Sequence, residues 1–463
     1  MKLVFAPLPF TIHRLAAPQA SAPRRSSVFL PVVLLTLAGL AGAAQAQFSA
    51  ARPLSLVPHA TSQTPTGPTA SAMQALISSS PTSFSSPSNS GDEGSFVTLQ
   101  AAPVTFSMQA LNTFSPNGDG WLSPAEQSFL TDGTTTVTQR GLAYNAVNNH
   151  LYITSRTGVG APIRVGVFDA STGAYIKDLS ITNISGGGAG ILTSIGVTTD
   201  GIIYASNAST TANGVNPYKV YRWADESANP AQVNFASLGL FNFRLGDNID
   251  VFGSDADGTT KIVSGYNDTA ASPAAGTGYT IVNPIILDST YVTVSNANAY
   301  RGGVAFVDGS TVWGTIGAGT GIARSKTDGT ALGTSTLTSS SERQIDITNV
   351  NGTWLMATIE ESGTAANNGR VRIYDITNSV VNGVNTITLL GALNLVGTQM
   401  ANANTGGAIT FGPVSGNDVT VYAMSTNNGV QAIKVTVPPI PEPTSAALLA
   451  GALGVLAGRR RRR

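Results

Sequence analysis

Few side chains of this chain have the types and spacing that acid–base or nucleophilic chemistry needs. Cysteine is absent, and two of the three histidines, His59 and His150, lie beyond the N-terminal apolar segment. A serine activated by histidine would have to use His150, since His59 stands in a low-complexity stretch. The carboxylate pairs Glu360–Glu361 and Asp247 with Asp250 have the chemistry for glycan cleavage, although adjacent strand residues point to opposite faces. We therefore expect no enzymatic activity, with a carboxylate-dependent glycan hydrolase or lyase as the alternative.

A second candidate is a metal loop at Ser115–Glu126, which reads SPNGDGWLSPAE. Counted as a twelve-residue calcium loop, it places Asn117, Asp119 and Glu126 at the third, fifth and twelfth positions, where oxygen ligands converge. A serine replaces the usual first aspartate, and two prolines interrupt the loop. The sequence thus leaves two interpretations, Ca²⁺ held by these three residues or an Asn-Gly-Asp-Gly turn beside a buried Trp121. We favour the turn and expect no other cofactor.

Arginines recur just before the first strand of four repeated units described below. They are Arg140, Arg244, Arg301 and Arg343. If these strands line a common axis, the guanidiniums converge at one mouth, where they would bind carboxylates, sulfates or phosphates by paired hydrogen bonds. The alternative, which we favour, is that each arginine pairs with a nearby acid such as Asp247, Asp250 or Asp346 and ties neighbouring units together.

The elements that must position these residues form a repeat that begins at Arg140. Six times, about every 40 to 70 residues, an apolar strand leads into a tight turn and a second strand. The turns are Asn148-Asn149, Asp200-Gly201, Asp257-Gly258, Asp308-Gly309, Asn351-Gly352 and Gly416-Asn417. Asparagine and glycine adopt positive φ at low cost, so these are hairpins. A third strand follows in each unit, and most units add a fourth.

Antiparallel units of four strands at this spacing predict an all-β fold, a six-bladed β-propeller with seven blades as the variant. A β-sandwich and a β-helix are the alternatives. The sixth unit ends at Val437 without a fourth strand. Because an exposed strand edge invites aggregation, we expect Thr134–Thr138 or Val104–Met108 to complete it and close the ring.

The N-terminus predicts export. Val28–Ala41 is an apolar core behind Arg24-Arg25, and the small residues Ala44 and Ala46 suit signal peptidase. Residues 1–46 are therefore expected to be a signal peptide. Residues 47–95 are rich in Ser, Thr and Pro and predict a disordered spacer, because such a composition buries too little apolar surface to fold. Residues 96–437 would form the propeller.

Residues 438–463 form a tail of three parts: Pro441, Glu442 and Pro443, an apolar run over Thr444–Gly458, and the cluster Arg459, Arg460, Arg461, Arg462 and Arg463. This tail resembles the PEP-CTERM sorting domains of bacterial envelope proteins. The resemblance implies transient insertion of the apolar helix in the inner membrane and processing by an exosortase-type enzyme. It also implies a final location in the cell envelope, at the cell surface or in the extracellular matrix.

The net charge expected for the mature chain limits the kinds of molecule that it can bind. Removing the four basic residues of the signal peptide and the five arginines of the tail leaves 16 basic against 25 acidic side chains. An acidic mature chain argues against nucleic acid, which needs a clustered basic surface.

The central region also resembles an uncharacterised family of secreted propeller-like domains, from about Phe106 to Val437. The segments that carry this resemblance are Gly120–Leu122, Arg140–Asn145, Tyr221–Trp223 and Arg244–Asp247. It implies a fold and an envelope setting but no established activity. We expect an exported, non-enzymatic binding module for envelope polysaccharide or another anionic ligand, with a passive matrix structural protein as a further alternative.

Overall fold

The computed structural model describes residues 104–130, 139–155, 163–185, 190–209, 216–233, 243–268, 277–294, 300–315, 320–360, 369–396 and 406–439. The expected signal peptide and spacer, and all but the first two residues of the expected sorting tail, lie outside these residues, and with them Ala44, Ala46, Pro441–Pro443 and Arg459–Arg463. Within the described ranges, no helix is both long and apolar enough to cross a membrane.

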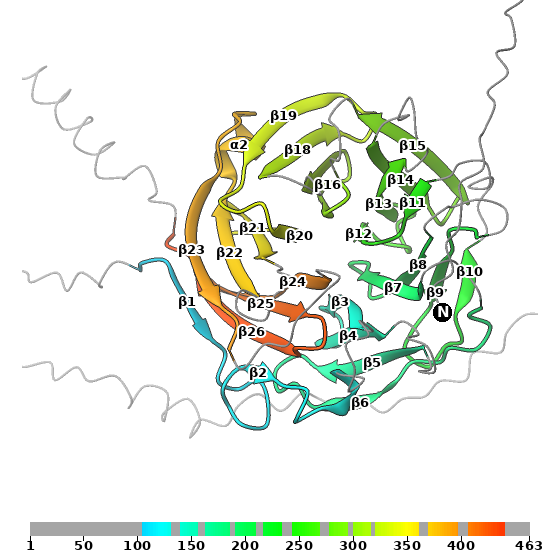
Figure 1. Ribbon diagram of the computed structural model, residues 1–463, viewed down its shortest axis with the longest axis horizontal. Coiled ribbons are helices and arrows are strands. Elements are labelled where there is room, and N and C mark those ends of the chain that lie inside the picture. The colour runs from blue at the N-terminus through cyan, green and yellow to red at the C-terminus, as the bar shows by residue number, and fades with distance from the viewer. Residues whose placement is uncertain are drawn as a thin grey trace, which may run out of the picture. The chain divides into compact units, whose positions relative to one another are not determined.

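Six antiparallel sheets stand around a common axis as the blades of a β-propeller (Figure 1). The first blade contains β3 (Gln139–Asn145), β4 (His150–Ser155), β5 (Arg164–Asp169) and β6 (Tyr175–Asp178), and the second β7 (Gly190–Val197), β8 (Ile203–Ala208), β9 (Val220–Trp223) and β10 (Ala231–Val233). The third contains β11 (Phe243–Leu245), β12 (Asp250–Phe252), β13 (Lys261–Asp268), β14 (Thr277–Asn283) and β15 (Asp288–Val294). The fourth contains β16 (Gly303–Asp308), β17 (Thr311–Thr315), β18 (Gly321–Lys326) and β19 (Ala331–Thr336).

The fifth blade contains β20 (Glu342–Val350), β21 (Thr353–Glu360), β22 (Arg370–Asp375) and β23 (Thr388–Asn394). The sixth contains β24 (Gly407–Ser415), β25 (Asp418–Ser425) and β26 (Val430–Thr436), with β1 (Ser107–Ala110) and β2 (Trp121–Leu122) on its outer side. The described helices are short, namely η1 (Ser128–Leu130) and α2 (Thr377–Val381). The all-β, six-bladed prediction is confirmed.

In five blades the predicted hairpin turn joins the first and second strands, and in the third blade it joins β12 to β13. Five of the six turns contain a residue with positive φ, for example 59° at Asn149, 50° at Asn351 and 87° at Gly201, whereas the turn at Asp308-Gly309 contains none. Local turn chemistry therefore favours the pairing of these five inner hairpins.

The ring is closed by the N-terminal strand of the domain. β1 pairs with β26 from Ser107 opposite Thr436 to Ala110 opposite Ile433, so the sixth blade obtains its outer strand from the start of the chain. Of the two predicted closing segments, Val104–Met108 overlaps this strand, whereas Thr134–Thr138 lies outside the described residues. Closure leaves the sixth blade without an unpaired outer edge at β26.

The apolar core is divided into six clusters, and each cluster joins the facing sides of two adjacent blades. Between blades one and two, for instance, Tyr152 and Val165 pack with Ile203 and Trp223. Each blade thus buries both of its faces, which explains why its central strands are nearly continuous runs of buried residues.

Phe114 locks the first and last blades together. It lies in the loop between β1 and β2, is fully buried, and contacts the ring of Tyr422 with centroids 5.6 Å apart. The hydroxyl of Tyr422 donates to the carbonyl of Ala170 in the first blade at 2.7 Å, and the N–H of Ser115 donates to the carbonyl of Thr172 at 2.9 Å.

Replacing Phe114 by alanine should therefore lower the free energy of unfolding by about 3–5 kcal/mol, because it opens a cavity at the closure. Val147→Ala, at a side chain that is 66% exposed, is the control and should change it by less than about 0.5 kcal/mol. Guanidinium chloride unfolding measures both values. Equal effects of the two substitutions would contradict the proposed lock.

Candidate functional site

The two faces of the propeller differ in what the strands place there. The inner strand of each blade begins on one face, here called the strand-start face, and ends at its hairpin turn on the other, the turn face. Arg140 and Arg343 lie in the first residues of β3 and β20, Arg244 lies in β11, and Arg301 precedes β16 by two residues. All four predicted arginines therefore belong to the strand-start face.

An irregular segment in the third blade brings an acid to this face. β11 and β12 both pair with β13, and the residues between them leave the ladder at Gly246, whose φ is 91°. A Cβ at Gly246 would lie 1.9 Å from the carbonyl oxygen of Asn207, so only glycine fits. This turn presents Asp247 to Arg244, whose Nε and Nη2 donate to its two carboxylate oxygens at 2.5 and 2.8 Å.

More than one arginine acts on Asp247. Burial tends to raise the pKa of this carboxyl, yet its pKa is lowered, because the hydrogen bonds and charge of Arg244 and the charges of Arg140 and Arg301 stabilise the carboxylate. Arg140 also lies against Gly406, where a Cβ would come within 2.1 Å of its Nη1. Arginines from blades one, three and four thus all stabilise this one carboxylate.

The fourth arginine and the other two expected acids behave differently. Arg343 is half-buried in β20 and has contacts of its own. Asp247 pairs with an arginine, as the second interpretation of the sequence predicted. Asp250 and Asp346 were also expected to pair with arginines, and this is wrong for both, because their oxygens accept hydrogen bonds from backbone N–H groups.

Asp250 and Asp346 occupy equivalent positions on inner strands two blades apart. Each carboxylate accepts one hydrogen bond from the next residue of its own strand and one from the neighbouring blade. Asp250 accepts from Val251 at 2.8 Å and from Phe306 at 2.6 Å. Asp346 accepts from Ile347 at 2.7 Å and from Phe411 at 2.6 Å. The two acids therefore tie the inner edges of adjacent blades together.

Burial raises the pKa of Asp250 to about 7, and the charge of Asp346 adds to this effect. Burial likewise raises the pKa of Asp346 to about 6, although its backbone hydrogen bonds oppose the shift. The described residues contain no group of three or more His, Cys, Asp or Glu side chains able to hold a metal ion.

This pair predicts a pH dependence of stability. The unfolded chain releases these protons near the ordinary pKa of 3.8, whereas the folded protein retains them to higher pH. Unfolding therefore releases protons, and the free energy of unfolding should fall as pH rises from about 4 to about 7. The double variant Asp250→Asn/Asp346→Asn should flatten this slope in urea unfolding. The free energy of unfolding of this variant at a single pH does not test the prediction, because an amide replaces only part of the hydrogen bonding of a carboxylate and changes stability for that reason alone. An unchanged slope would show that the pKa values of Asp250 and Asp346 are not the cause of the pH dependence.

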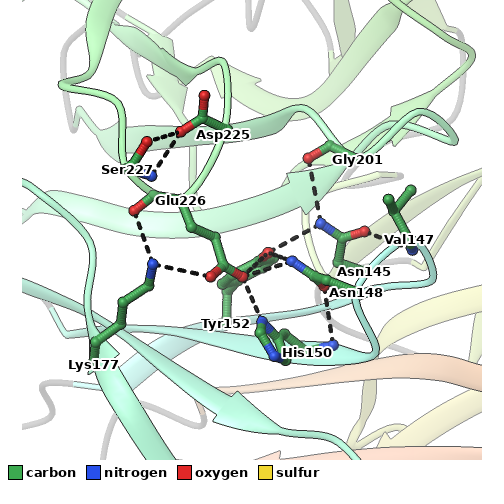
Figure 2. A network of polar contacts seen from close by, with 10 residues as sticks. All are labelled: Asn145, Val147, Asn148, His150, Tyr152, Lys177, Gly201, Asp225, Glu226 and Ser227. Atoms are coloured by element: carbon green, nitrogen blue, oxygen red, sulfur yellow. Dashed lines mark hydrogen bonds and ion pairs between the residues drawn. The ribbon is translucent and has the colours of Figure 1, made fainter. Parts of the chain in front are cut away.

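His150, the histidine that a serine-based device would need, lies in a network that links the first two blades (Figure 2). Its Nδ1 lies 2.5 Å from Oε1 of Glu226, which also accepts hydrogen bonds from Tyr152 at 2.8 Å and Asn148 at 2.6 Å. Lys177 lies 3.1 Å from the other carboxylate oxygen. Burial opposes ionisation of Glu226, but these donors lower its pKa. Among the described residues the imidazole hydrogen-bonds to this carboxylate and to no hydroxyl, so the network is an inter-blade clamp.

Glu360, a carboxylate proposed for the glycan hydrolase or lyase alternative, also forms a structural hydrogen bond and an ion pair. Glu360 lies 2.8 Å from Nη1 of Arg372 and accepts from the hydroxyl of Ser339 at 2.8 Å, while Glu361 lies outside the described residues. Sequence reasoning missed Glu342, which is fully buried, accepts from Tyr374 at 2.8 and 2.9 Å and lies 3.6 Å from Arg372. No local pattern marks this network, because its members come from three different strands of blade five.

The candidate calcium loop is an ordered turn that packs outside blades six and one. Oδ1 of Asp119 accepts from the hydroxyl of Ser115 at 2.8 Å and from the N–H of Trp121 at 2.9 Å. Glu126 accepts from the N–H groups of Asn117 at 3.3 Å and Ser123 at 2.8 Å. Trp121 is half-buried rather than buried, and its Nε1 donates to the carbonyl of Asn428 at 2.8 Å. Calcium binding by Asn117, Asp119 and Glu126 stays a prediction.

Comparison with known proteins supports the fold. The structure is similar to a DUF4623 family protein from Bacteroides eggerthii, with 14% identity and a TM-score of 0.52 over 73% of this chain and 77% of that one. It is also similar to a protein of unknown function from Dyadobacter fermentans, with 11% identity and a TM-score of 0.46 over 66% and 97%. The PQQ-bound aldose sugar dehydrogenase from Streptomyces coelicolor matches with 14% identity and a TM-score of 0.40 over 72% and 100%. No family model and no curated protein matches the sequence.

Proposed function

We propose that this protein is an exported propeller that binds an anionic polysaccharide, or another polyanion, at the mouth on its strand-start face. The ligand-binding residues are Arg140, Arg244, Arg301 and Arg343. The observation that carries the proposal is the paired hydrogen bonding of Arg244 to the carboxylate of Asp247, whose pKa the charges of Arg140 and Arg301 also lower. Guanidinium groups bind carboxylate and sulfate groups with paired hydrogen bonds, and a ligand on the axis would meet groups from several blades at once.

Both ends of the described segment lie on the face opposite the proposed binding site. Ser107, at the start of β1, lies opposite Thr436, and the N–H of Val437 donates to the carbonyl of Asn417 in a hairpin turn of the turn face. The described segment thus begins and ends at the turn face.

The state of the carboxylates favours binding over catalysis. Glu226, Glu342 and Glu360 are each held by several donors, and Asp250 and Asp346 accept backbone hydrogen bonds from two blades. Carboxylates with these structural duties are poor candidates for an acid and base that must act on a substrate. A glycan hydrolase or lyase and a passive matrix protein are the alternatives that the first experiment separates.

We propose in addition that signal peptidase and an exosortase-type enzyme process the two ends and that the mature protein resides in the cell envelope or extracellular matrix. This part rests on the sequence of the termini, from Ala44 and Ala46 to the Pro-Glu-Pro and arginine cluster.

Replacing Arg140 or Arg301 by alanine should weaken retention on polyuronate or sulfated glycans about tenfold each, the usual scale of a lost charge-assisted hydrogen bond. Affinity electrophoresis against acidic and neutral polysaccharides measures this. Arg164→Ala is the control, because Arg164 lies in β5 and pairs with Asp178 of the same blade at 2.8 Å. Shortening of the polymer would support the enzyme, and retention by no polysaccharide would support the passive matrix protein.

Asp247→Asn should strengthen binding to the same polyanions several-fold and make it more salt-dependent. The amide keeps the size of the side chain but removes the negative charge that competes with the ligand for the arginines. Dissociation constants measured across a range of sodium chloride concentrations test both expectations. Unchanged affinity and salt dependence would place the ligand elsewhere on the protein.

A further inference from the structure

A cleft on the turn face opens between blades three and four. Its volume is about 580 Å³, which lies within the range of small-molecule sites. It is formed by the hairpin turns of the two blades and by the end of β14. The residues that matter here are Phe252, Lys261, Asn283, Asp308, Gly309 and Ser310. None of the arginines of the mouth lines it.

Phe252 gives the cleft a fixed aromatic surface. It is the last residue of β12 and is 36% exposed, although large apolar side chains on this domain are mostly buried. Its ring packs on Phe306 with centroids 5.7 Å apart and lies so close to Gly309 that a Cβ there would be 2.9 Å from a ring carbon. The ring is thus held by its neighbours while part of its surface remains open to the cleft.

Two polar side chains of the cleft each have one hydrogen-bonding atom without a partner among the described residues. Oδ1 of Asp308 accepts from the N–H and hydroxyl of Ser310 at 2.7 and 2.8 Å, while its Oδ2 has no partner among the described residues. Oδ1 of Asn283 accepts from the N–H groups of Ile285 and Ile286, while its Nδ2 has none in the same part of the chain. One acceptor and one donor are therefore available in the cleft.

The charge in the cleft is balanced. Lys261 donates to the carbonyl of Gly309 at 2.6 Å, and it is the one cationic side chain beside the one carboxylate of Asp308 in the lining. A ligand with a net charge would gain little here. An apolar peptide would cover the free donor and acceptor without satisfying them, which costs free energy.

We propose that this cleft binds a neutral pyranose unit of a polysaccharide. The C–H face of the sugar would lie on Phe252, one hydroxyl would donate to Oδ2 of Asp308, and another would accept from Nδ2 of Asn283. Rigid aromatic surface with a few placed polar groups is the usual composition of a small-molecule site. The site lies on the face opposite the arginine mouth, so it is separate from the anion site proposed above.

The test is calorimetric titration of the full-length mature protein with neutral oligosaccharides of glucose, mannose, galactose or xylose. We expect saturable binding of at least one of them. Phe252→Ala should weaken it about tenfold or more, since aromatic contacts are worth on the order of one such factor. Phe252→Trp should retain it. Gly309→Ala should also weaken it, because the added Cβ displaces the ring.

Asn283→Asp removes the donor while keeping the oxygen that caps its turn, and it should weaken binding without affecting thermal unfolding. Asp288→Asn, on the same turn but outside the cleft, is its control. Arg140→Ala and Arg301→Ala should leave binding of neutral sugars unchanged, so failure of the cleft and failure of the mouth are distinguishable. The proposal is overturned if none of the neutral oligosaccharides binds, if Phe252→Ala binds them as well as the wild type, or if the cleft instead mediates self-association in sedimentation velocity.

Discussion

Burial of both faces of every blade is the constraint on which the rest of this structure depends. Among the described residues, each of the six apolar clusters lies between two adjacent blades. An isolated blade would expose two apolar faces to water, so each blade requires a neighbouring blade on either side. Only a closed ring gives every blade two neighbours. This is why the first described strand serves the last blade, and why Phe114 and Tyr422 are buried where the ends of the ring meet.

Closure leaves one edge per blade facing the axis, and these inner edges need hydrogen-bond partners that are not strands. Asp250 and Asp346 supply them, as does Ser194, whose hydroxyl accepts from the N–H of Ile249 at 2.9 Å. Carboxylates near the axis of this ring are therefore structural groups. Backbone N–H groups at the turn face also need acceptors. Asp169, Asp225 and Asp308 accept hydrogen bonds from the N–H groups of their own turns and place negative charge on that face.

The parts of the molecule that local chemistry decides could be predicted from the sequence. Asparagine and glycine at the six turns, and the missing strand after Val437, indicated the hairpins, the blades and the closing segment. What depended on side chains meeting across blades could not. Nothing near Glu226 or Glu342 in the sequence marks His150 or Arg372 as a partner. Asp250 and Asp346 follow the same Ile-Asp pattern on inner strands, yet this pattern meant backbone hydrogen bonding rather than pairing with arginine.

The arrangement of charge explains why binding groups remain on the two faces at all. A residue in a tight turn has its polar atoms within reach of the turn's own N–H groups, so turn aspartates are consumed by capping, and only an oxygen left over, such as Oδ2 of Asp308, is available to a ligand. Arginines at the starts of inner strands lie outside these hairpin turns. Asp247 balances part of their charge because Gly246 allows the chain to leave the ladder there. The proposed polyanion site therefore lies on the face that carries the four arginines, whereas the proposed sugar site lies in a cleft whose lining holds one cation and one carboxylate.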